Sequence, residues 1–152
     1  MPTKKCIVAG CMVIEGGKML MLKHRKLGIW VPPGGHVEEN EFPYEAAIRE
    51  TKEETGVDVE LIGDDNVKHA DEAAHTLPEP FAILYENVPY KTKPMHIHFD
   101  MVYVGRIVGG EVAANDESTD IKWMDREEIS IMESFPNVKE VALKALEKYA
   151  DM

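Results

Sequence analysis

Three glutamates near the middle of the chain, Glu50, Glu53 and Glu54, are spaced so that their carboxylates would share one side of a helix. At roughly 100° per residue, they fall within an arc of about 100°. The like-charged pair Glu50 and Glu54 would cost an isolated helix about 0.2–0.5 kcal/mol. Mg²⁺ prefers carboxylate and phosphate oxygens, so a bound cation would offset that cost. The helix alone leaves two interpretations open, a metal site and a solvated acidic face.

The residues around these glutamates favour the metal site over the solvated acidic face. Five residues separate Gly35 from Glu41, and seven more lead to the segment RETKEETGV at residues 49–57. This order resembles the Nudix hydrolase signature, G-x5-E-x7-R-E-U-x-E-E-x-G-U, in which U is a bulky aliphatic residue. The fixed positions match without a gap, and Thr51 stands where an aliphatic residue is usual. Thr51 is β-branched and is expected to face the core, so this departure concerns packing rather than metal binding.

The resemblance implies roles for individual residues. Arg49 would orient the carboxylates, and Glu41 would brace the junction between the preceding loop and the helix. From its position four residues earlier, Glu45 is also expected to hold the Arg49 guanidinium. The implied ligands of Mg²⁺ or Mn²⁺ are the side chains of Glu50, Glu53 and Glu54 and the backbone carbonyl of Gly34.

The implied reaction is hydrolysis of a nucleoside diphosphate linked to another group. Metal ions would neutralise the pyrophosphate and lower the pKa of an attacking water. A carboxylate must take the proton of that water. Glu53 is the first candidate for this base, and Glu79 or Glu117, from loops outside the signature, is the alternative.

Alternating polar residues mark one predicted strand. His96, His98 and Asp100 share one face of residues 96–108, opposite Ile97 and Phe99. Three interpretations remain open: a zinc site, which lacks further ligands nearby, a solvent-exposed face, and a wall of the substrate pocket. The resemblance favours the pocket wall for His98 and Asp100.

Four residues near the signature are further candidates for substrate contact. Trp30 could stack on a nucleobase or pack on the neighbouring prolines, and His24 or Arg25 could contact phosphate or form a solvated strand end. His36, in the loop that leads to the helix, could approach the phosphate or make a local hydrogen bond.

The elements that would position these residues follow from periodicity and turn signals. Pro43 suits the first turn of the helix, and Gly56 suits its stop. Residues 30–35, with two prolines and two glycines, are expected to form a rigid loop, and residues 63–80 a polar and mobile one. Strands are predicted at 7–14, 18–24, 57–62, 81–86, 96–108 and 121–124, and two later helices are predicted to open at Asp125 and Asn137.

Composition bounds the class of protein. The 152 residues suit one domain, 1–152, and 17 Lys and Arg against 28 Asp and Glu give a net charge of −11. That charge argues against a nucleic-acid-binding face or a polybasic membrane anchor. No apolar run is long enough to span a membrane. Cys6 and Cys11 are expected on opposite faces of one strand, so we expect no disulfide and a cytoplasmic setting.

The predicted elements indicate a mixed β-sheet with helices on its faces, an α/β fold, and the resemblance implies a Nudix-type α/β/α sandwich. The predicted function is Mg²⁺- or Mn²⁺-dependent hydrolysis of a pyrophosphate bond in a small nucleotide. A nucleoside or deoxynucleoside triphosphate, including oxidised ones, is favoured because tags of several other Nudix subgroups are missing. The alternatives are a non-catalytic nucleotide-sensing or interaction module and an isoprenoid isomerase, which would need a catalytic cysteine. A homodimer is compatible with the sequence, although no feature requires one.

Overall fold

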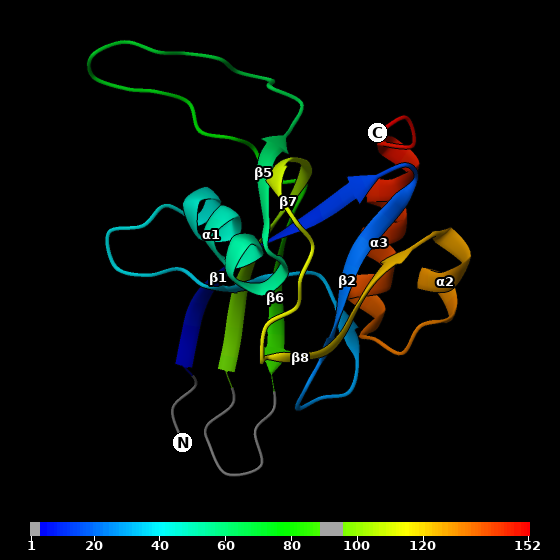
Figure 1. Ribbon diagram of the computed structural model, residues 1–152. Helices are drawn as coiled ribbons and strands as arrows, with labels where there is room; N and C mark the ends of the chain where they lie inside the picture. Colours follow the sequence, from blue (N-terminus) through cyan, green and yellow to red (C-terminus); the bar gives the residue numbers. More distant parts are fainter. Residues whose placement is uncertain (1–3, 89–95) are drawn as a thin grey trace.

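The computed structural model describes residues 4–88 and 96–152 (Figure 1). None of the helices among these residues is long and apolar enough to cross a membrane. The elements in chain order are β1 (Lys4–Glu15), β2 (Lys18–His24), β3 (Trp30–Val31), β4 (Gly34–His36), α1 (Pro43–Thr55), β5 (Val57–Ile62), β6 (Ala82–Val88), β7 (His96–Gly110), β8 (Ser118–Met124), α2 (Arg126–Ile131) and α3 (Pro136–Lys148).

A mixed sheet organises the molecule. Its main path runs β3-β2-β1-β7-β5, while β4 pairs with β1, β6 with β7 and β8 with β2. The β1–β7 pair is parallel and the other pairs are antiparallel. Helix α1 lies on one side of this sheet and α3 on the other (Figure 1). The predicted α/β sandwich with a mixed sheet is therefore confirmed.

Residues 8–14 of β1 are largely buried on both faces of the sheet, which explains their nearly continuous apolar sequence. Met12 and Ile14 belong to the core under α3, whereas Cys11 and Val13 belong to the core under α1. Cys6 and Cys11 lie on opposite faces, as the odd spacing predicts, and both are free. Burial raises the pKa of the Cys11 thiol to about 12, so this thiol is not a nucleophile at neutral pH.

Helix α1 begins and ends where the sequence predicts. Pro43 occupies its first turn, and Gly56 ends it in the left-handed conformation with φ of 81°. Thr51 is fully buried, and its hydroxyl donates to the carbonyl of Ala47 at 2.7 Å. The prediction that Glu45 holds the Arg49 guanidinium is wrong. The Glu45 carboxylate instead accepts from the backbone N–H of Phe42 at 3.0 Å and so caps the helix.

Two other local predictions differ from the structure. Residues 30–35 contain the short strands β3 and β4 on either side of Pro32 and Pro33, and the carbonyl of Pro33 accepts from Cys11 N–H at 3.1 Å. Proline lacks an N–H but keeps its acceptor, so the segment can still dock on β1. Helix α3 begins at Pro136 rather than behind an Asn137 cap. The Asp125–Glu128 capping box of α2 is as predicted.

Candidate active site

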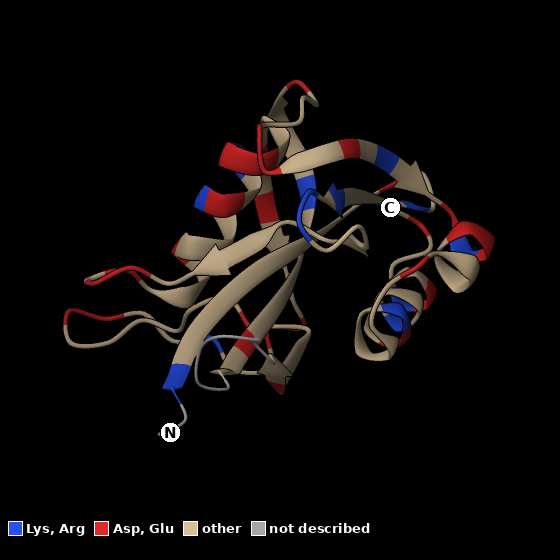
Figure 2. Ribbon diagram, turned by 90° about the horizontal axis from the view of Figure 1, so that it is seen from below, with Lys and Arg blue, Asp and Glu red and all other residues tan. Residues whose placement is uncertain are grey.

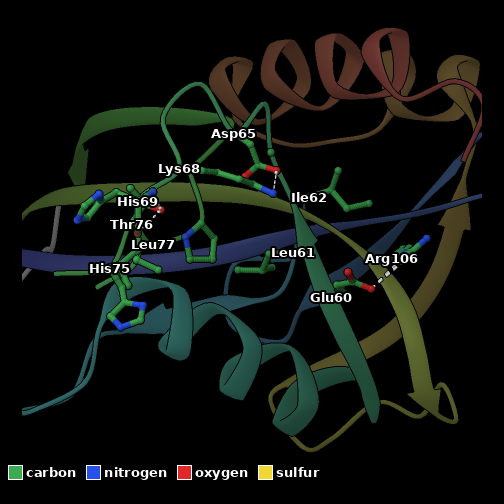
Figure 3. A pocket seen from close by; sticks show the side chains of 13 residues that line it. Glu60, Leu61, Ile62, Asp65, Lys68, His69, His75, Thr76, Leu77 and Arg106 are labelled. Carbon is green, nitrogen blue, oxygen red and sulfur yellow. Dashed lines mark hydrogen bonds and ion pairs between the residues drawn. The ribbon is translucent and has the colours of Figure 1, made fainter. Parts of the chain in front are cut away.

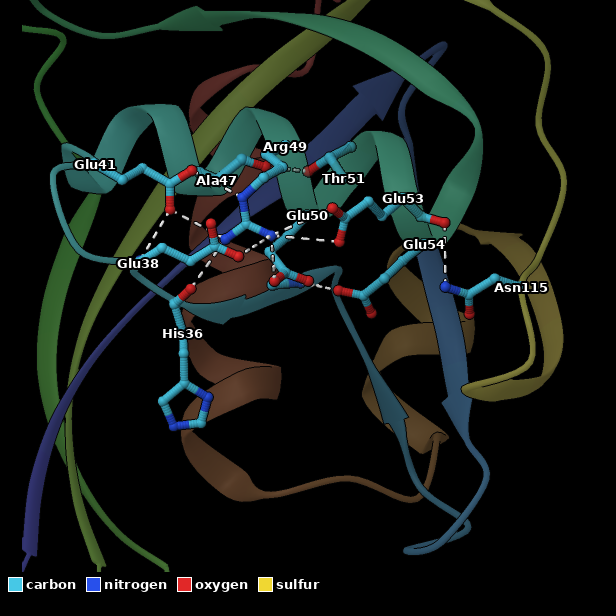
Figure 4. A network of polar contacts seen from close by, with 11 residues as sticks. His36, Glu38, Glu41, Ala47, Arg49, Glu50, Thr51, Glu53, Glu54 and Asn115 are labelled. Carbon is cyan, nitrogen blue, oxygen red and sulfur yellow. Dashed lines mark hydrogen bonds and ion pairs between the residues drawn. The ribbon is translucent and has the colours of Figure 1, made fainter.

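Arg49 is the centre of the polar contacts around α1 (Figure 4). Its guanidinium binds both oxygens of Glu41, at 2.8 and 3.0 Å, in a bidentate pair. It also donates to Glu50 Oε1 at 2.9 Å, to Glu53 Oε2 at 3.3 Å and to the carbonyl oxygen of His36 at 3.1 Å. The hydrogen bond from Arg49 holds the pKa of Glu41 below its usual range. Arg49 therefore fixes the loop, β4 and two of the signature glutamates relative to one another.

Glu54 is the most buried of the three signature glutamates. Its Oε1 accepts from the N–H of Gly34 at 3.0 Å. Burial is the main cause that raises the Glu54 pKa to about 8, and the hydrogen bond and charge of Glu50 and the charge of Glu117 add to the rise. Glu50 and Glu54 thus lie close enough to share a proton.

Gly35 leaves the space that the Glu50 carboxylate fills. A Cβ atom at Gly35 would lie 2.6 Å from Glu50 Cδ and within 2.8 Å of both carboxylate oxygens. Any side chain at Gly35 would therefore displace the Glu50 carboxylate, so the glycine allows this carboxylate to lie against β4.

The donor set fits a hard divalent cation. Among the described residues, no three His, Cys, Asp or Glu side chains converge as a ready metal cage. Glu50 and Glu54 nevertheless share a hydrogen bond beside the Gly35 cradle, and Glu53 is on the same helix face. Two carboxylates that must share a proton have the charge and oxygen chemistry that Mg²⁺ or Mn²⁺ would satisfy.

The two alternative bases lie in different places. The charge of Glu117 acts on Glu54, and the neighbouring Asn115 donates to the Glu53 carbonyl at 3.1 Å. Glu79 binds the N–H and the side-chain amide of Asn66 at 3.2 and 3.1 Å in the 63–80 loop. Glu117 is therefore the loop glutamate that faces the signature. Sequence reasoning missed Asn115, which carries no local signal of this contact.

The side chains of His24 and Arg25 make hydrogen bonds to the backbone of the turn after β2 and of the loop before β8. His24 Nδ1 accepts from the N–H groups of Lys26 and Leu27, both at 3.2 Å. Arg25 donates to the carbonyl oxygens of Asp116 at 2.6 Å and Ser118 at 3.3 Å. These contacts tie the turn after β2 to the loop that carries Glu117.

A cavity of about 290 Å³ opens between this turn and that loop. The Lys26 ammonium at its wall has no hydrogen-bond or ion-pair partner among residues 4–88 and 96–152. The sequence pattern indicated a phosphate contact for His24 or Arg25 but none for Lys26. The lining residues are His24, Arg25, Lys26, Asp116 and Glu117.

Trp30 lies against the core on the α3 side. The backbone N–H of Trp30 donates to the carbonyl of Glu133 at 2.9 Å, and the backbone carbonyl of Trp30 accepts from the Ser134 hydroxyl at 2.6 Å. The Lys23 ammonium is 5.9 Å from the centre of the indole ring. The ring of Trp30 packs against the core on the α3 side, whereas the packing alternative from the sequence named Pro32 and Pro33 as its partners.

His36, His98 and Asp100 come together on the α3 side of the sheet. Val8 of β1 pairs with His36 on one side and with Asp100 on the other. The rings of His36 and His98 meet edge to face, with centroids 5.6 Å apart. Glu86, from β6, lies across from His98 in the register. Sequence reasoning missed Glu86 because β6–β7 pairing alone brings it here.

A larger cavity, about 700 Å³, lies away from these residues (Figure 3). It is bounded by β5 and by the 63–80 loop, which extends from the body of the molecule (Figure 1). Its charged residues are largely paired, with Arg106 bound to Glu60 at 2.9 Å and Lys68 to Asp65 at 3.4 Å. No residue of the signature lines it.

Comparison with known proteins agrees with this geometry. The chain is 30% identical over 129 residues to a MutT-like protein of Streptomyces ambofaciens. This match covers 85% of this chain and 69% of that protein. It is 36% identical over 64 residues to an 8-oxo-dGTP diphosphatase of Proteus vulgaris. This match covers 39% of this chain and 57% of that protein. A crystal structure of a NUDIX-family hydrolase from Clostridium perfringens superposes with a TM-score of 0.75, at 27% identity over 93% of this chain and 96% of that one.

The family model of the NUDIX domain matches residues 4–147, so the match includes both cores, the α1 glutamates and the Gly34–Gly35 strand. Proteins of this family are hydrolases of phosphorus-containing anhydrides and generally use a divalent metal ion. The chain belongs to the Nudix hydrolase family.

Proposed function

We propose that this protein hydrolyses a pyrophosphate bond of a nucleoside or deoxynucleoside triphosphate, including oxidised ones, with Mg²⁺ or Mn²⁺. The observation that carries the proposal is the Glu50–Glu54 pair, held against Gly34 and Gly35 and oriented by Arg49. The name of the Proteus vulgaris relative, an 8-oxo-dGTP diphosphatase, supports the choice of a triphosphate. The substrate would be a small molecule, and a homodimer would be compatible with the reaction.

The α1 glutamates would hold the metal. Glu50 and Glu53 would exchange their contacts with Arg49 for the cation, and Glu54 would give up the proton that it shares with Glu50. The carbonyl oxygen of Gly34 would add a ligand from β4. When bound, the metal neutralises phosphate charge and lowers the pKa of a coordinated water.

Side chains around the metal would transfer the proton, orient the carboxylates and bind the phosphate. Glu53 would take the proton of the attacking water, and Glu117 is the second candidate because its charge already acts on Glu54. Arg49 would keep the carboxylates oriented through its bidentate contact with Glu41. The Lys26 ammonium, which has no partner in the described part of the chain, would contact the phosphate farthest from the nucleoside, with its turn held by His24 and Arg25.

Two residues from the sequence analysis would contact the other end of the substrate. His98 and Asp100 lie beside His36, whose carbonyl oxygen is bound to Arg49. A nucleotide could therefore extend from the cavity at Lys26, past Gly34 and Gly35, toward β7. Trp30 would support the adjoining core rather than stack on the base.

The test is product analysis on a panel of nucleoside triphosphates, oxidised dGTP and ADP-ribose. Each substrate is incubated with Mg²⁺, with chelator, and with the Glu53→Gln variant. The matched control is Glu60→Gln, an exposed glutamate paired with Arg106 outside the site. We expect cleavage of triphosphates that requires both the metal and Glu53 and survives in the control. Tight nucleotide binding without cleavage of any substrate would instead favour a sensing module.

A further inference from the structure

The loop between β7 and β8, residues 111–117, is held against the end of α1. The backbone N–H of Ala113 donates to the carbonyl of Thr55 at 2.8 Å. The side-chain amide of Asn115 donates to the carbonyl of Glu53 at 3.1 Å (Figure 4). The loop therefore closes on the last turn of the helix that carries the signature glutamates.

Asn115 uses both halves of its amide group. Its NH₂ group donates to the Glu53 carbonyl, and its Oδ1 accepts from the backbone N–H of Glu117 at 2.9 Å. The Glu53 carbonyl lies in the last turn of α1, where carbonyl groups have no partner further along the helix. One side chain thus links the backbone of a signature glutamate to the backbone of Glu117.

The chemistry of asparagine suits this bridge. Its amide offers a donor and an acceptor, and the contact needs the donor at α1 and the acceptor at the loop. An aspartate would offer acceptors alone and would face the Glu53 carbonyl with a like partial charge. A serine hydroxyl could still accept from an N–H two residues on, but it is too short to reach α1 as well.

Arg25 holds the other end of the loop. Its guanidinium donates to the carbonyl oxygens of Asp116 and Ser118, and its backbone N–H donates to the carbonyl of Glu117 at 3.0 Å. The backbone of Glu117 is therefore fixed from two sides, by α1 through Asn115 and by the turn after β2 through Arg25. Without the Asn115 amide the loop would stay attached at Arg25, so we expect a displaced Glu117 rather than an unfolded chain.

The Glu117 side chain is exposed, and its carboxylate forms no hydrogen bond or ion pair within residues 4–88 and 96–152. Its position is therefore set by its backbone. We propose that Asn115 is a positioning residue that holds the Glu117 carboxylate beside the signature glutamates for the metal-dependent reaction. The inference rests on the proposed nucleotide hydrolysis. The charge of Glu117 already acts on Glu54, which agrees with this placement.

The first experiment is a double-mutant cycle on the hydrolysis of dGTP with Mg²⁺. Asn115→Ala and Glu117→Gln should each lower kcat at least about tenfold and leave KM within about twofold, because a misplacement of about 1 Å can cost about 10²-fold in rate. The double variant should be no slower than Glu117→Gln, since Asn115 acts through Glu117. Losses that multiply in the double variant would overturn the proposal.

Two further variants separate the bridge from its parts. Asn115→Ser keeps an acceptor for the Glu117 N–H but does not reach α1, so it should be as slow as Asn115→Ala. The matched control is Lys52→Met, which removes a hydrogen bond to the Gly56 carbonyl at the same end of α1, 3.2 Å long, and should leave kcat unchanged. Wild-type kcat in Asn115→Ser would overturn the role of the bridge.

Mn²⁺ binding without nucleotide tests the bridge independently of hydrolysis, through the electron paramagnetic resonance signal of free Mn²⁺. A carboxylate held near the signature strengthens cation binding, so Asn115→Ala and Glu117→Gln should each weaken it about threefold. The double variant should be no weaker than Glu117→Gln. This pattern without cleavage of any nucleotide would support the bridge and refute the proposed reaction. Cleavage of dGTP with wild-type kcat and Mn²⁺ affinity in Asn115→Ala would overturn the bridge and leave the reaction standing.

Discussion

Gly35→Ala should damage catalysis far more than stability. The added Cβ would lie 2.6 Å from Glu50 Cδ, whereas carbon atoms in contact prefer about 3.5–4.0 Å. The carboxylate is the far end of a flexible side chain, so it would move by about 1 Å while β4 stays in place. A displacement of about 1 Å at a catalytic group can cost about 10²-fold in rate. We therefore expect kcat/KM to fall about 100-fold, with a weaker apparent affinity for Mg²⁺.

The assay combines Mg²⁺ titrations of the rate with thermal unfolding. Gly35 does not have a left-handed backbone, so alanine adds no strain there, and the free energy of unfolding should fall by no more than about 1 kcal/mol. Gly109→Ala is the matched control, because its Cβ would meet the tip of a carboxylate, Asp58 Oδ2, at 3.2 Å outside the site. Wild-type activity and Mg²⁺ dependence in Gly35→Ala would refute the argument that this glycine positions Glu50.

Three further predictions follow from the geometry. Lys26→Met should raise KM for a triphosphate about tenfold with little change in kcat, whereas Lys144→Met, on α3, should change neither; an unchanged KM would remove Lys26 from the site. Burial raises the folded-state pKa of Asp100 to about 8, above its unfolded value, so its stabilising contribution is present at low pH and is lost as pH rises toward and through 8. The unfolding free energy of metal-free protein, from urea titrations between pH 5 and 8.5, should therefore fall less steeply in Asp100→Asn, and equal slopes would contradict a raised pKa at Asp100. Thr51→Val should change stability by less than about 1 kcal/mol and leave kcat unaltered in the same assays, because the hydroxyl donates to the carbonyl of Ala47 and lies beside the Cys11 thiol in the core; a loss of activity would show a role beyond packing.

The fold and the signature were accessible from the sequence because their signals are local. The spacing of Pro43 and Gly56 gives the limits of α1, and turn signals give the β1–β2 hairpin. The strands β3 and β4 were missed because two- and three-residue strands carry no period. Their pairing depends on the backbone of β1, which no pattern within residues 30–36 reports.

The contacts between distant segments were less accessible. Helix spacing predicted that Glu45 binds the Arg49 guanidinium. The helix N-terminus, however, has unsatisfied N–H groups, and Glu45 accepts a hydrogen bond from one of them. Glu86 and Asn115 join the site through strand pairing and loop closure, and their own neighbours in the sequence do not distinguish them. Lys26 follows Arg25 directly, and only the folded loop shows that Arg25 binds the carbonyl oxygens of Asp116 and Ser118, so the sequence does not distinguish the two residues.

The parallel β1–β7 pair also has a consequence for biogenesis. Lys4 pairs with His96 and Val13 with Gly105, so β1 cannot complete this pairing until β7, far along the chain, has been synthesised. The metal-binding helix is synthesised in between and cannot dock on a finished sheet until β7 has emerged. Such distant pairing slows folding and prolongs the time for which apolar β1 is uncovered. Truncated nascent chains that end before β7 should therefore carry the complete signature yet remain protease-sensitive and dependent on chaperones.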